Sequence, residues 1–167
     1  RIVSFVHGGE QEKGRRASTE NVPGIVGFGK AAEIAQRDSD REANRLNSLR
    51  EKLSKGLVER IDSIHLNGHP TQRLPNNINI SVGGVEGEHL LLLLNARGIC
   101  VSTGSACSSG SAEPSHVLLA LGLSPERARG SVRLTLGRET ATRDIDRVLG
   151  VLPEVVGELL SARRRKN

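Results

Sequence analysis

The chain has 167 residues, enough for one domain with a sizeable core or for a small domain with an appendage. Its 24 Lys and Arg exceed its 19 Asp and Glu, but two Phe without any Tyr or Trp give nucleic-acid bases almost nothing to stack on. Two cysteines with six residues between them make neither a disulfide framework nor a zinc site, and no apolar run could span a bilayer. These features exclude a disulfide-rich secreted protein and a membrane-spanning protein, and they predict a protein of the reducing cytoplasm.

The N-terminal third predicts a short buried strand at Ile2–Val6, a turn at His7–Glu10 and then a long helix. Thr19 and Asn21 are candidate caps for this helix, Pro23 suits its first turn, and Gly56 is a plausible end. Because the chain has no Met and starts directly in the strand-like segment, we expect it to be part of a longer protein. N-terminal processing is the competing explanation.

Alternating apolar residues predict strands at 63–67, 77–82 and 131–136, and a further brief strand at 99–101 in which Cys100 would be a buried core residue. A helix is expected at 86–97, where five consecutive Leu suggest burial on most sides, and another at 114–122. The last helix begins near Thr142, with Asp144 favourable in its first turn, and Pro153 should kink or divide it. Strands alternating with helices predict an α/β fold, a short sheet packed by helices.

Cys107 lies in a run of Gly, Ala, Ser and Thr that predicts a mobile loop, residues 102–113. Free amides, hydroxyls and the helix beginning after Pro114 would favour its thiolate, the nucleophilic form. The alternative is a small residue in a Gly/Ser linker, and the run by itself leaves both open. A lone cysteine on a mobile polar loop is nevertheless placed to move and react.

Two further residues could bind ligands. Arg133 projects from its strand opposite the apolar side chains, where a guanidinium can receive a carboxylate; the alternative is an ordinary surface arginine. Thr19 and nearby backbone amides could hold a phosphate at the helix start, or Thr19 could be a plain cap. The five histidines show neither metal-ligand spacing nor a triad. The basic run Arg163–Lys166 is interpreted as a solvated helix end, with nucleic-acid binding as a weak alternative.

Three segments together resemble one family. They are residues 96–122 (ARGICVSTGSACSSGSAEPSHVLLALG), 131–138 (SVRLTLGR) and 7–22 (HGGEQEKGRRASTENV). They resemble group I cysteine desulfurases, pyridoxal-phosphate enzymes of aminotransferase class V that supply sulfur for iron–sulfur cluster assembly and other thiolation pathways. The match runs nearly end to end, but it covers only the C-terminal half of the family's length.

The resemblance implies the fold of pyridoxal-phosphate enzymes of fold type I. Residues 1–30 would end the large cofactor domain, and residues 31–167 would form a connecting helix and a small α/β domain carrying the cysteine loop. Cys107 would attack the sulfur of L-cysteine, carry it as a persulfide, and transiently ligate an iron–sulfur cluster on a scaffold or other acceptor protein. Arg133 would bind the substrate carboxylate, and Thr19 the cofactor phosphate of the other subunit of a homodimer.

The chain also departs from this pattern. Glu10 and Ser18 replace glycines of the family, so we expect strain at Glu10 and a less favourable phosphate site beside Thr19. None of the five lysines has the context of the lysine that binds the cofactor. The isolated chain is therefore expected to be inactive. A catalytically silent fragment, or a sulfur-relay or partner-binding module, is the alternative function.

Overall fold

The computed structural model describes residues 3–103 and 113–165. The chain divides into two compact units, Arg1–Asp40 and Arg41–Asn167, and helix α1 (Val22–Arg60) passes from the first into the second. No helix in the described ranges is long and apolar enough to cross a membrane. The assignment of residues 1–30 and 31–167 to a large and a small domain stays a prediction.

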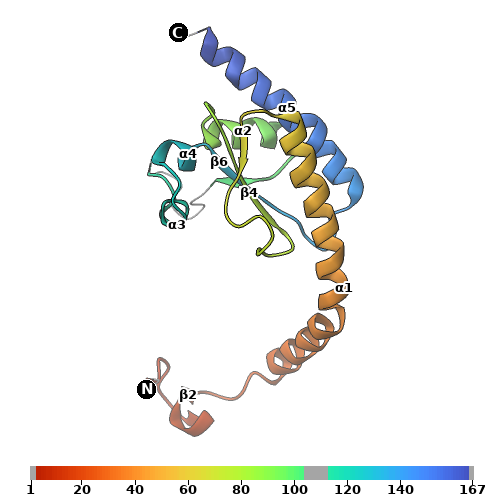
Figure 1. Ribbon diagram of the computed structural model, residues 1–167. Coiled ribbons are helices and arrows are strands. Elements are labelled where there is room, and N and C mark those ends of the chain that lie inside the picture. Colours follow the sequence, from red (N-terminus) through yellow and green to blue (C-terminus); the bar gives the residue numbers. More distant parts are fainter. Residues whose placement is uncertain (1–2, 104–112, 166–167) are drawn as a thin grey trace. The chain divides into compact units, whose positions relative to one another are not determined.

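The second unit is built on a four-stranded antiparallel sheet, seen beside its helices in Figure 1. The strand order is β3 (Ile64–Leu66), β4 (Asn77–Val82), β6 (Ser131–Thr135) and β5 (Ser102–Thr103). The three alternating segments are therefore strands, as predicted, and the α/β fold class is confirmed.

The fourth strand lies at Ser102–Thr103 and not at 99–101, because the chain pairs with β6 only from Ser102 onward. Ile99 reaches the core, but the thiol-bearing Cys100 next to it is exposed. The prediction that Cys100 is buried is wrong. An alternating pattern over three residues does not determine which side chain faces the core until the strand's partner is known.

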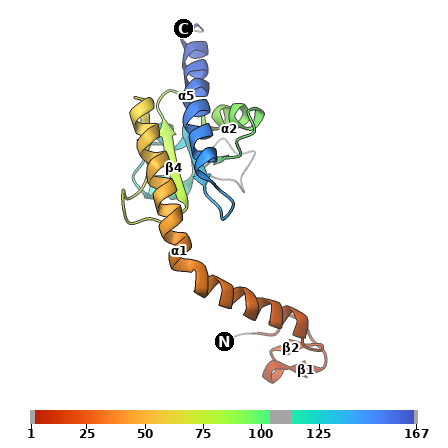
Figure 2. The same ribbon diagram turned by 90° about the vertical axis from the view of Figure 1, so that its right-hand side faces the viewer.

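One face of the sheet makes the core. Figures 1 and 2 show the second half of α1 and helix α5 (Thr142–Arg164) next to each other over β4. Helix α2 (Gly87–Ala96) packs against α5 and the sheet. The side chains buried to at least 98% between these layers are apolar: Leu53, Leu57, Ile78, Ile80, Val82, Leu90, Leu94, Val132, Ile145, Leu152 and Val155. Burial of these side chains supplies most of the stability of the unit.

Helix α1 begins where the cap and the proline predict. The backbone N–H of Gly24 donates to Oδ1 of Asn21 at 3.1 Å, and Pro23 occupies the first turn. The helix does not stop at Gly56 but continues to Arg60. A Cβ on Gly56 would lie 2.8 Å from Cδ2 of Leu149, so this glycine permits close packing of α1 on α5 instead of ending a helix.

Helix α5 begins at Thr142 as predicted, with Asp144 accepting a 2.8 Å hydrogen bond from the N–H of Ala141. It runs unbroken to Arg164, so Pro153 does not divide it. Leu152, Val155 and Val156 around the proline are all buried, and their packing stabilises the helix through this turn.

In α2 only the outer two of the five consecutive leucines, Leu90 and Leu94, are buried, while Leu92 is 61% exposed. The expectation of burial on most sides is wrong, because α2 contacts the domain along one face only, and residues four apart share that face. Helix α3 (His116–Ala120) is followed by Gly122 in the left-handed region, close to the predicted end.

Helix α4 (Pro125–Arg129) was not predicted from the sequence. Ser124 caps it by accepting from the N–H of Arg127 at 3.2 Å, and the Ser-Pro-Glu start was the available signal.

In the first unit, β1 (Glu10–Gln11) and β2 (Arg16–Ala17) form a small hairpin across the 3-10 turn η1 (Glu12–Gly14). The described part of the predicted strand at Ile2–Val6 is not a strand, and Phe5 is 96% exposed. No described strand pairs with this segment, and a strand forms only where a neighbour satisfies its backbone.

Candidate functional site

The face of the sheet opposite the core carries polar side chains from three neighbouring strands and from the residue that follows the fourth. Arg133 of β6 lies opposite Asn79 of β4 on one side and opposite Ser102 of β5 on the other. Asn67, directly after β3, continues the line, because its N–H donates to the carbonyl of Asn79 at 2.8 Å. We call Asn67, Asn79, Arg133 and Ser102 the polar row.

One end of the polar row is held tightly. Asn67 is 4% exposed, and its Nδ2 donates to Oδ1 of Asn79 and to Oγ of Ser81, both at 2.7 Å. Because the oxygen of Asn79 accepts from Asn67, the orientation of the Asn79 amide is set from that side. The Oδ1 of Asn67 is buried and has no hydrogen-bond partner among the described residues.

Arg133 is exposed between buried Val132 and Leu134, so it projects opposite the core as predicted. Its Nε donates to Oγ of Ser102 at 3.1 Å. Within residues 3–103 and 113–165 no carboxylate pairs with it. The other N–H groups of the guanidinium therefore stay available to an anion, and their planar arrangement suits the two oxygens of a carboxylate.

Cys107 lies outside the described residues. Of the loop predicted at 102–113, residues 102–103 instead form β5, because they pair with β6, and residues 104–112 lie outside the described ranges. The sequence nevertheless places Cys107 close along the chain to the polar row, since Ser102 and Thr103 of β5 directly precede residues 104–112. Four residue steps from Thr103 to Cys107 span at most about 14 Å.

Thr19 belongs to the first unit, where it is exposed just before α1. Asn21 caps the helix, so Thr19 is not the cap, and its hydroxyl makes no hydrogen bond within the described ranges. Ser18 has a φ of +74°, a conformation that favours glycine. Glu10 instead pairs with Ala17 in the hairpin and is outside that region, so the strain expected at Glu10 is not present.

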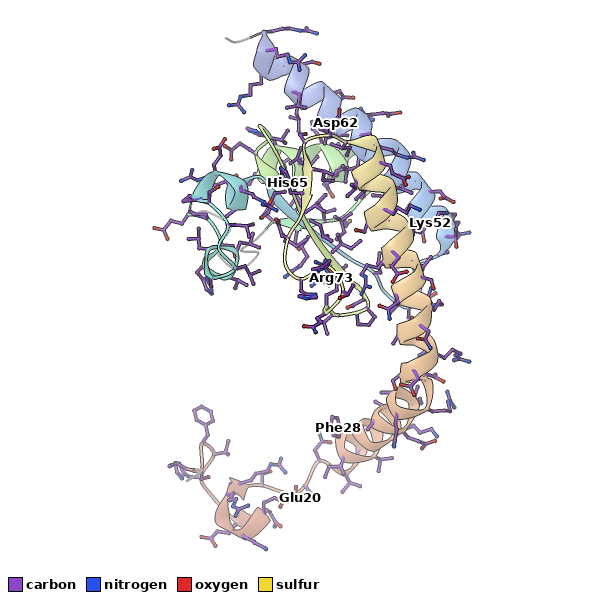
Figure 3. All side chains as sticks on the ribbon, viewed as in Figure 1. Glu20, Phe28, Lys52, Asp62, His65 and Arg73 are labelled. Carbon is purple, nitrogen blue, oxygen red and sulfur yellow. The ribbon has the colours of Figure 1, made fainter. Side chains whose placement is uncertain are left out.

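The lysines in the described ranges lie on the surface. Lys30 pairs with Glu33 at 2.7 Å and Lys52 with Asp146 at 2.5 Å; Figure 3 labels Lys52 on the side of α1 toward α5. Lys55 is 4.0 Å from Glu59 and 81% exposed, and Lys13 is exposed in η1. None of these four is enclosed as a lysine that binds a cofactor covalently would need to be.

Two other kinds of site, a metal site and a pocket, were considered among the described residues. Among the described residues no three His, Cys, Asp or Glu side chains gather into a metal site. A pocket of about 690 Å³ lies between the end of β4, α2, α4 and α5, lined in part by His65, His89 and Arg127. Arg133 does not line it. The candidate site is therefore the exposed face of the sheet, with its polar row.

Comparison with solved structures defines the class of fold. A NifS-like protein matches 92% of the chain with a TM-score of 0.78 and 34% identity, and the chain covers 39% of it. A NifS-like protein from Rickettsia africae matches 93% with a TM-score of 0.77 and 30% identity, and the chain covers 40% of it. The fold is that of pyridoxal-phosphate enzymes of fold type I.

The family model for aminotransferase class-V matches residues 3–148, and the chain belongs to this family. "Cysteine desulfurase IscS" of Methanosarcina thermophila is 56% identical over 95% of the chain, and "Cysteine desulfurase IscS 1" of Archaeoglobus fulgidus is 50% identical over 96%. The chain covers 39% and 42% of the lengths of these two relatives.

Proposed function

We propose that the chain is part of a cysteine desulfurase in which Cys107 removes sulfur from L-cysteine and leaves L-alanine. The observation that carries this proposal is Arg133, whose exposed guanidinium has no carboxylate partner among the described residues. It lies beside β5, the strand that leads into the segment bearing Cys107. A carboxylate receptor on β6, and a thiol that follows the neighbouring strand β5 by a few residues, suit a substrate that is itself an amino acid.

The reaction is a transfer of one sulfur atom. The Cys107 thiolate attacks the sulfur of L-cysteine, so an S–S bond forms as the C–S bond breaks. The carbon that loses sulfur gains a proton, and the products are L-alanine and a persulfide on Cys107. Arg133 binds the substrate carboxylate through its Nη groups and so fixes the direction in which the substrate sulfur points.

The described residues fit one part of pyridoxal phosphate, its phosphate group. The exposed hydroxyl of Thr19, which has no intramolecular partner within the described ranges, would donate to a phosphate oxygen. When bound, the cofactor withdraws electrons from the substrate and so makes its C–S bond cleavable. The four lysines that the structure describes do not fit its aldehyde. None of the five lysines of the sequence has the context of the family's cofactor lysine, so we propose that this lysine is supplied from outside residues 1–167.

Thr19 would contact the cofactor of the other subunit of a homodimer. The persulfide would pass to a scaffold or other acceptor protein in the cytoplasm, where Cys107 would transiently ligate the iron–sulfur cluster being assembled. In this proposal the iron–sulfur cluster is a product under assembly and not a resident cofactor of the chain.

The test is alanine release from L-cysteine by the full-length gene product, with persulfide on the protein measured by mass spectrometry. We expect Cys107→Ser to abolish both signals and Arg133→Ala to raise the KM for L-cysteine. Cys100→Ser is the matched control, because Cys100 is exposed and plays no part in the proposed reaction. Full alanine release by the Cys107→Ser protein would refute the proposal.

The second candidate is a silent fragment or a sulfur-relay module, favoured by the lack of an enclosed lysine in the described residues. It predicts that residues 1–167 alone, mixed with pyridoxal phosphate, develop no new cofactor absorbance and release no alanine. Alanine release from the full-length gene product would show that the chain works as part of an enzyme. If the full-length gene product releases no alanine, the relay function is favoured.

A further inference from the structure

We propose that Ser102 is a positioning residue that holds the Arg133 guanidinium in the orientation that receives the substrate carboxylate. This inference rests on the proposed function of Arg133 and extends it to a neighbouring residue. The observation behind it is the 3.1 Å hydrogen bond from Nε of Arg133 to Oγ of Ser102.

The sheet register brings these two side chains together. Ser102 and Arg133 are directly opposite in the β5–β6 ladder, so their side chains stand next to each other on the same face. An exposed arginine otherwise samples many rotamers, and binding a ligand then requires this freedom to be lost. Holding Nε fixes the plane of the guanidinium while Nη1 and Nη2 stay available for both oxygens of a carboxylate.

The other polar side chains next to Arg133, those of Asn79 and Thr135, do not hold its guanidinium in place. Across β4 the oxygen of Asn79 already accepts from Nδ2 of Asn67 at 2.7 Å. Thr135, two residues along β6 on the same face, is exposed and makes no hydrogen bond with Arg133. Among the described residues, the hydroxyl of Ser102 is the side-chain acceptor that the guanidinium uses.

The experiment measures steady-state alanine release from L-cysteine by the full-length gene product and four variants. Ser102→Ala removes the acceptor, Ser102→Thr keeps a hydroxyl, and Arg133→Ala removes the receptor itself. Thr135→Ala is the matched control, because it deletes a hydroxyl from the same face of the sheet without touching the bond. A thermal unfolding curve of each variant verifies that it is folded.

We expect Ser102→Ala to raise the KM for L-cysteine about fivefold, the net effect of one ordinary hydrogen bond, with kcat changed less than about twofold. Ser102→Thr and Thr135→Ala should keep the original KM, and Arg133→Ala should raise it further than Ser102→Ala does. A merely structural role of Ser102 would instead lower the unfolding temperature and leave the KM unchanged.

The remaining outcomes would contradict either the positioning role of Ser102 or the substrate-binding role of Arg133. If Arg133→Ala raises the KM and Ser102→Ala does not, Ser102 does not position the arginine. The same conclusion follows if Ser102→Thr behaves like Ser102→Ala, or if Thr135→Ala gives an equal increase. If Arg133→Ala leaves the KM unchanged, the substrate-binding role of Arg133 is wrong, and the inference about Ser102 falls with it.

Discussion

Gly87 occupies the first turn of α2, where alanine would ordinarily favour the helix, yet the surrounding backbone leaves no room for a side chain. A Cβ built there would lie 2.5 Å from the carbonyl oxygen of Ser131 and 2.9 Å from that of Arg129. Both oxygens belong to the backbone that leads from α4 into β6, so neither can rotate away as a side chain would. Gly87→Ala therefore tests how closely α2 packs on this segment.

The change in the free energy of unfolding caused by Gly87→Ala is the sum of two opposing effects. Alanine gains up to about 1 kcal/mol of helix propensity over glycine. To reach an ordinary separation of 3.4 Å, the Ser131 oxygen must move about 0.9 Å, and overpacking of this kind costs about 1–3 kcal/mol. We expect a net loss of about 1–2 kcal/mol, or a fall in Tm of roughly 5 °C.

Urea unfolding of the chain, followed by far-ultraviolet circular dichroism, measures this loss. Gly150→Ala is the matched control, since Gly150 lies in the exposed middle of α5 with no atom within 4 Å of the added Cβ. The control should gain about 0.5–1 kcal/mol from helix propensity. A Gly87→Ala protein as stable as the original, beside a control that gains as expected, would refute the close packing described for α2.

Three further changes test the core, the electrostatics and the exposed thiol. Leu53→Ala empties a site that is 1% exposed and should cost about 2–5 kcal/mol in urea unfolding; less than about 1 kcal/mol would contradict its place in the core. The hydrogen bond from Arg45 lowers the pKa of Glu42, so its carboxylate stabilises the fold above the ordinary pKa of 4.5 and loses this effect as the pH falls through the lower folded value. Glu42→Gln should flatten the decline of Tm with acid, and an unchanged pH profile would contradict the pairing. Cys100→Ser should change stability by less than about 0.5 kcal/mol, because the residue is exposed; a large loss would mean that the thiol is buried.

The candidate site could be predicted in part. The alternation around Arg133 was enough to place it opposite the core. The Gly/Ser-rich run left both a reactive thiol and a linker residue open for Cys107, which lies outside the described residues, so its role stays a prediction. Ser102 and Asn79 were missed, because what makes them relevant is their position across two ladders from Arg133. Strand order and register are not readable from one sequence. The signal that was present, polar residues at alternate positions of neighbouring strands, acquires meaning only once the strands are paired.

Sequence periodicity by itself determined the long segments: α1, β4, β6 and α5 begin where their caps and apolar spacing indicate, because many residues contribute to each pattern. The short elements, and the helices that contain a glycine or a proline, were decided only by the tertiary structure. Gly56 and Pro153 lie inside continuous helices because buried neighbours such as Leu149 and Leu152 hold those turns in place. Residues 3–6 form no strand, and Cys100 is exposed, because a strand and its buried face exist only where a partner supplies hydrogen bonds.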